Sequence, residues 1–166
     1  MDNKSLGFDF KFEHRNADGE ILWESDWLPN HFTDDGIELM FDEFFRGADA
    51  PTKFMIGLNT ANLSQTSSYT DLVEPTGTGY ELKDITRNNT GFPTLALDNN
   101  NMQIITAEVT FENTDSTAWT GVTDGFLAAD LTSNVLVNYR PLSATRTLQP
   151  GDTLSVTIQM KGLQPA

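Results

Sequence analysis

The sequence contains no cysteine, few basic residues and only two histidines, and each shortage excludes a class of function. Without cysteine, the chain can form neither disulfides nor thiolate metal sites. Ten lysines and arginines stand against 24 acidic residues, which gives a net charge of −14. Because phosphate backbones are bound by clustered basic side chains, we do not expect nucleic acid as a partner.

Long apolar runs are also absent. No stretch approaches the roughly 20 residues of a membrane-spanning helix, so we expect no membrane association. The first ten residues, MDNKSLGFDF, lack the apolar core of a signal peptide, so we do not expect secretion. The chain of 166 residues is long enough to bury a core and fits one domain, residues 1–166.

Residues that could carry catalysis do not form a known motif. His14 and His31 lie in different contexts, which disfavours a histidine metal site. Gly77-Thr78-Gly79 lacks the lysine and helix of a phosphate loop, and no serine stands in a G-x-S-x-G motif. The turn at Asp98–Asn101 could offer oxygen ligands to calcium, but an Asx turn fits it better. We therefore predict no catalytic residues, no cofactor and no metal.

The sequence pattern predicts a helix over residues 33–46. Thr33 can cap its start, Asp34 and Asp35 suit the positive end of the helix dipole, and Gly47 suits its end. Apolar side chains recur at helical spacing, at Ile37, Met40, Phe41, Phe44 and Phe45. The stripe could be a partner-docking face, but we expect it to pack on the core of a sheet.

The rest of the chain shows the period-two alternation of strands, bounded by turn residues. The expected strands are residues 7–14, 20–27, 53–58, 80–86, 92–97, 102–112, 121–130, 134–142 and 153–161. This pattern predicts a mainly β protein: an antiparallel β-sandwich, Ig-like or jelly-roll-like, with one inserted amphipathic helix. Residues 59–79 are rich in Ser, Thr and Asn and are expected to form a mobile loop.

Several short motifs, in order along the chain, resemble a loosely characterised family of tailed-bacteriophage virion proteins. The matching residues are Gly19-Glu20-Ile21-Leu22-Trp23-Glu24, Asn30, Gly36, Leu39, Phe44, Gly47, Phe54–Leu58, Val109-Thr110-Phe111, Gly125-Phe126-Leu127 and Pro150–Val156. The resemblance implies a small β-sandwich structural protein without catalytic residues, assembled in the host bacterial cytoplasm and located in the virion. It would bind phage capsid or tail proteins, or copies of itself.

Within this resemblance, a capsid decoration protein is the first interpretation, and a head–tail or tail accessory protein is the alternative. Two other classes remain open: a carbohydrate- or receptor-binding β-sandwich, and a small hydrolase. A sugar-binding module would use exposed aromatic residues, for which Trp119, with Trp23 and Trp27, is the candidate.

Negative charge is concentrated near the start of the chain. Residues 1–50 contain 13 acidic and 4 basic residues, a net charge of −9. A separate acidic face could steer the protein onto a basic partner, or it could simply keep the chain soluble. We take Asp18, Glu20, Glu24 and Trp119 as the candidate partner-binding residues.

Overall fold

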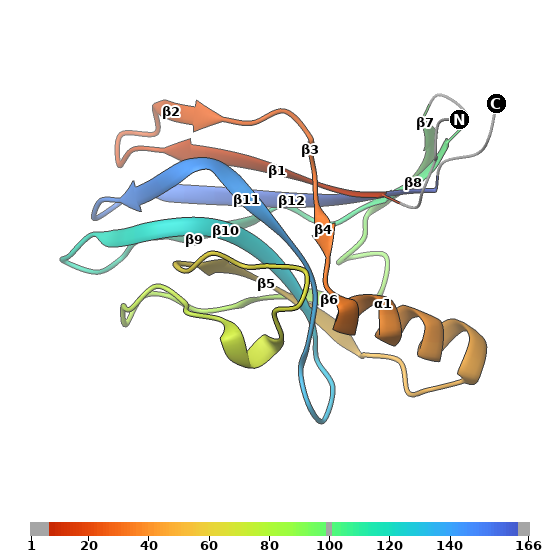
Figure 1. Cartoon of the computed structure of the whole chain (residues 1–166). Helices are drawn as coiled ribbons and strands as arrows, with labels where there is room; N and C mark the ends of the chain where they lie inside the picture. Colours follow the sequence, from red (N-terminus) through yellow and green to blue (C-terminus); the bar gives the residue numbers. More distant parts are fainter. Residues whose placement is uncertain (1–6, 99–100, 163–166) are drawn as a thin grey trace.

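The computed structural model describes residues 7–98 and 101–162, which form two antiparallel sheets packed face to face (Figure 1). Sheet A has the order β2 (Ile21–Glu24), β1 (Gly7–Arg15), β12 (Thr153–Gly162), β8 (Asn101–Ile105), β7 (Thr94–Asp98), with β3 (Leu28–Pro29) on β1 and β9 (Val109–Glu112) on β12. Sheet B has the order β4 (His31–Phe32), β11 (Val135–Leu148), β10 (Trp119–Ala129), β5 (Lys53–Asn59), β6 (Lys83–Thr86). The predicted antiparallel β-sandwich with one inserted helix is confirmed.

The core lies between the sheets and follows the alternation seen in the sequence. Phe8, Phe10 and Phe12 of β1 are buried, and each pairs with an apolar residue of β12, such as Ile158 opposite Phe10. Ile56 and Leu58 of β5 belong to the same buried cluster on sheet B. Each such side chain contributes about 1.5–3 kcal/mol on burial, so this layer holds the two sheets together.

The expected strand 102–112 is two strands, because the pairing with β12 is interrupted at Thr106. The Thr106 N–H donates to the carbonyl of Ile158 at 2.9 Å, and the Ile158 N–H donates to the Thr106 hydroxyl at 3.0 Å. A side-chain acceptor here replaces the backbone acceptor of a regular ladder. Regular pairing with β12 therefore stops after β8 and resumes at β9. Strand β8 also pairs with β7.

Residues 59–82 cover the outer face of sheet B and include the short 3-10 helix η2 (Tyr69–Asp71). They supply Leu63, Tyr69, Leu72 and Leu82 to a second apolar cluster, over Met55, Phe126, Ala128, Leu136 and Tyr139 of the sheet. Two hydrogen bonds link residues 59 and 60 to Val73. The Thr60 N–H donates to the Val73 carbonyl at 2.7 Å, and the Val73 N–H donates to Asn59 Oδ1 at 2.6 Å. The segment thus forms a third layer, and its mobility stays a prediction.

The helix α1 (Asp34–Phe41) continues as the π-helical turn η1 (Asp42–Arg46), which confirms the expected helix. The Thr33 hydroxyl accepts from the N–H of Gly36 at 3.0 Å, and Gly47 ends the helix with φ of 71°. Figure 1 shows the helix leaving one end of the sandwich and extending past the sheets.

The expectation that the apolar stripe of the helix packs on the core is wrong for Phe41 and Phe45. Their side chains are 58% and 80% exposed. The sandwich is met by the start of the helix instead, where Gly36 is buried against the backbone of Val137 and Leu39 packs on the core. The later turns extend beyond the sheet, so the side chains of Phe41 and Phe45 face solvent, while the side chain of Phe44 lies outside the described part of the structure.

Candidate docking surfaces

The far end of the helix presents two exposed aromatic rings, which we call the helix tip surface (Phe41 and Phe45). The ring centroids lie 6.1 Å apart with an angle of 58° between the planes. Large exposed apolar side chains that gather on a monomer commonly mark interaction sites. Aromatic side chains are also the residues that most often anchor protein interfaces.

The helix that carries this surface and the residues next to it are acidic. Residues 33–50 contain six acidic residues and one arginine, a net charge of −5. Arg46 binds Asp42 at 2.8 Å and Arg87 binds Glu43 at 2.5 Å. Asp35, Glu38 and Asp49 are exposed and have no ion-pair partner among the described residues. The helix tip surface is thus an apolar pair with an acidic rim.

A second exposed apolar surface lies on the β7–β8 hairpin. Leu95 and Leu97 are each 68% exposed, and Met102 pairs directly with Leu97 across the two strands. The row continues across sheet A, because Leu95 pairs with Ile104, Ile104 with Met160, and Met160 with the buried Phe8. Opposite residues in an antiparallel pair share a face, so this surface prolongs the core-facing side of sheet A beyond the cover of sheet B.

Both apolar surfaces lie at the same end of the sandwich. The ring of Phe8, at the start of β1, meets the ring of Phe32 edge-on at 4.9 Å, and Phe32 directly precedes the helix cap Thr33. Figure 1 shows α1 and the β7–β8 hairpin at this end, below and above the gap between the sheets.

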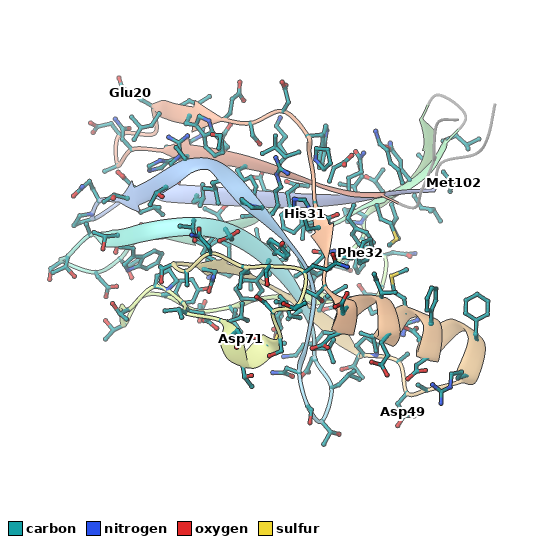
Figure 2. All side chains as sticks on the ribbon, in the orientation of Figure 1. Glu20, His31, Phe32, Asp49, Asp71 and Met102 are labelled. Carbon is teal, nitrogen blue, oxygen red and sulfur yellow. The ribbon has the colours of Figure 1, made fainter. Side chains whose placement is uncertain are left out.

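The acidic candidates Asp18, Glu20 and Glu24 lie at the opposite end, around the β1–β2 turn. Glu20 is held by Asn16, whose amide group donates to Glu20 Oε2 at 3.0 Å, and all three carboxylates are exposed. The nine residues of β1 separate the two ends by roughly 25 Å at ~3.3 Å per residue. Figure 2 shows the separation, with Glu20 and Asp49 at opposite ends of the molecule. The acidic residues among 7–50 therefore do not form the one face that we expected.

Trp119 is not available to a surface partner, which corrects its place among the candidates. It is 2% exposed, and its indole N–H donates to Asp115 Oδ2 at 2.7 Å. Trp23 packs on the ring of Phe12, with the guanidinium of Arg146 lying 4.1 Å from the centre of the indole. Because Trp119 is buried, the three tryptophans do not form an exposed sugar-stacking platform.

The histidines lie in separate environments. His14 is buried with Nε2 3.2 Å from Asp152 Oδ2, and His31 packs on the ring of Tyr139. Over residues 7–98 and 101–162, no three histidine or acidic residues come together as a metal site. The turn at Asp98–Asn101, the candidate calcium loop, includes residues 99–100, which lie outside the described part of the chain. No described helix has the length and apolarity to cross a membrane.

A family model described as podophage GP4 fiber I protein gp80 matches residues 33–164 of the 166-residue chain. The chain belongs to this family. None of the curated proteins compared with it matches the chain. Membership of the gp80 family confirms the resemblance to structural proteins of bacteriophages, and it favours the tail accessory interpretation over capsid decoration.

The region matched to the gp80 family begins at Thr33, the cap of α1. It includes the helix tip surface and the β7–β8 hairpin, and it leaves out Asp18, Glu20 and Glu24. Sequence reasoning missed Leu95, Leu97 and Met102. The period-two spacing of Leu95 and Leu97 indicates a shared face, and the pairing of Met102 with Leu97 adds Met102 to it. Only the exposure of these side chains in the folded protein shows that the face is uncovered.

Proposed function

We propose that the chain is a non-catalytic structural component of a phage tail fibre and binds another virion protein through the helix tip surface. The observation that carries the proposal is the family match over residues 33–164, which includes this surface. A fibre family supports a place at the tail more than a place on the capsid shell. The burial of Trp119 removes the main reason for a sugar-binding module.

The helix tip surface has the chemistry of a docking anchor. Burying a phenylalanine in an interface contributes about 1.5–3 kcal/mol, and two adjacent rings can fill one apolar pocket. The acidic rim adds long-range attraction to a basic surface. The partner is therefore a virion protein with an apolar pocket rimmed by lysine or arginine. Asp18, Glu20 and Glu24, around the β1–β2 turn, remain predicted residues of a second contact, which would be electrostatic.

The test uses phage particles that carry Phe41→Ser and Phe45→Ser together. Copies of the protein per purified particle are counted by quantitative mass spectrometry, and antibody labelling in electron microscopy locates them. We expect label at the tail and at least a tenfold loss of copies in the variant, since about 1.4 kcal/mol corresponds to tenfold in affinity. The matched control is Val73→Ser, a half-exposed apolar residue on the segment over sheet B.

Both variants change exposed side chains and should melt at the wild-type temperature, which separates docking from folding. Label spread over the capsid shell would support decoration and contradict the fibre proposal. Absence of the wild-type protein from the particle would contradict any virion role. Equal copy numbers in wild-type and Phe41/Phe45 variant particles would show that docking uses another surface.

A further inference from the structure

Strand β7 is an outer strand of sheet A, and no strand among residues 7–98 and 101–162 pairs with its outer edge. This edge differs from the edges of the other outer strands. Exposed edges can pair with another chain, and proteins usually protect them with charge, bulges, proline or short length. Strands β3 and β4 have two residues each. The remaining protected edges carry charged residues: Glu20 and Glu24 around β2, Lys83 and Asp84 in β6, Glu108 and Glu112 around β9.

β7 has fewer of these protections, with Pro93 just before its first residue. Its sequence, TLALD, has one charge, at the last residue Asp98, and its pairing with β8 runs without a register shift. By contrast, the pairing of β2 with β1 shifts register between His14 and Arg15. Leu95 and Leu97 of β7 are the most exposed leucines of the described chain, and they stand on one face of the strand.

Charge decides what can pair with this edge. Two copies of a chain with a net charge of −14 repel each other unless they meet where charge is sparse. Residues 91–105, which contain the β7–β8 hairpin, carry only Asp98 as a charged residue. This region is therefore suited to contact with a second copy, whereas the acidic helix tip surface is not.

We propose that β7 pairs antiparallel with β7 of a second copy about a two-fold axis through Ala96. In this register Leu95 faces Leu97 of the other copy, and the four leucines form one apolar face. Asp98 then lies opposite Thr94 of the other copy, so the two aspartates are not paired with each other. The two A sheets become one continuous sheet, and the free N–H and C=O groups of both edges are satisfied.

The predicted dimer is weak, because a five-residue strand buries much less area than the 1,200–2,000 Å² or so of stable complexes. We expect a dissociation constant in roughly the micromolar range. This inference does not depend on the fibre assignment: a monomeric protein could still dock onto the virion, and a dimer could form without it.

The test is sedimentation equilibrium of the full chain over about a hundredfold range of concentration that spans the micromolar range. The wild-type protein should pass from monomer to dimer, and the double variant Leu95→Lys, Leu97→Lys should weaken dimerisation at least tenfold. The matched control is Ile21→Lys, Leu22→Lys, which changes charge equally at two exposed residues of β2, the edge strand with acidic flanks. Added lysines reduce the net negative charge in both variants, so general repulsion cannot explain a loss in only one.

Hydrogen exchange of the wild-type protein provides a second measurement that needs no variant. Amides of β7 should become protected as concentration rises, while those of β6, the outer strand of sheet B, should not change. A wild-type chain that stays monomeric, a trimer in place of a dimer, or equal dimerisation in both lysine variants would overturn the proposal. Protection that appears elsewhere and not on β7 would also overturn it.

Discussion

At the scale of single residues, Asp115 connects three parts of the chain. Its Oδ1 accepts from the hydroxyl of Thr78 at 2.8 Å and from the N–H of Gly79 at 3.1 Å, and its Oδ2 accepts from the indole of Trp119. A side chain at Gly77 would overlap both the carboxylate and the indole. The Gly77-Thr78-Gly79 motif therefore makes room for a carboxylate of the protein itself.

These contacts predict how stability depends on pH. The hydrogen bond from the Trp119 indole holds the pKa of Asp115 below its ordinary value of 3.8, and the bond from the Thr78 hydroxyl lowers this pKa further. The carboxylate stabilises the fold at pH values above its unfolded pKa, and this contribution is lost as pH falls through the lowered pKa. Asp115→Asn should therefore lower the melting temperature at neutral pH, and the gap to wild type should narrow on acidification.

Melting temperatures of both proteins between about pH 2 and pH 7 measure this gap. A gap of constant size across the range would mean that the ionised carboxylate of Asp115 does not stabilise the fold. The sequence made Trp119 a candidate for an exposed binding residue. It did not predict burial, because the ring that meets the Trp119 indole edge-on at 5.6 Å belongs to Tyr80, which is distant in the sequence.

At the scale of elements, the helix shows what local pattern can and cannot predict. The cap at Thr33, the early acids and Gly47 predicted both ends of the helix correctly. The apolar stripe predicted one hydrophobic face, but not what would cover it. Contact depends on where the helix crosses the sandwich, and that position is set by a glycine.

Gly36 is that glycine. A Cβ atom there would lie 2.7 Å from the carbonyl carbon and Cα of Val137, and Thr33 donates to the carbonyl oxygen of Val137 at 3.2 Å. Gly→Ala in a helix normally gains about 1 kcal/mol. Here we expect Gly36→Ala to lose about 1–3 kcal/mol of unfolding free energy, because backbone on the sheet must move.

Chemical denaturation measures the change, and Glu38→Ala is the matched control on the exposed side of the same helix. The control should stay within about 0.5 kcal/mol of wild type. A more stable Gly36→Ala protein would mean that the helix does not rest on β11 as described.

The β7–β8 hairpin shows a similar limit for strands. Alternation predicted both strands, but it also joined residues 102–112 into one strand, since Thr106 fits the polar positions of the pattern. The interruption arises from the bond between the Thr106 hydroxyl and β12, a contact across 52 residues. This tertiary geometry determines which faces of the strands remain uncovered. The alternation of apolar and polar residues in the sequence does not reveal it.

At the scale of the whole molecule, the sequence predicted the fold class and the phage virion resemblance, but not the arrangement of layers. The regular alternation of apolar and polar residues and the frequent turn residues were enough to predict a β-sandwich. The packing of residues 59–82 on sheet B was not visible, because Leu63, Tyr69, Leu72 and Leu82 are spaced irregularly. The sequence alone did not separate a capsid role from a tail role, and the gp80 family match favours the tail.

We propose that the chain is a fibre component that docks on a neighbouring virion protein through Phe41 and Phe45. Cryo-electron microscopy of the intact phage particle tests it most directly. We expect density for the sandwich at a tail fibre, with both phenylalanine rings covered by an apolar pocket of a neighbouring virion protein and basic side chains near Glu38 and Asp49. Density for the sandwich on the capsid shell, or at a fibre with the helix tip surface facing solvent, would contradict it.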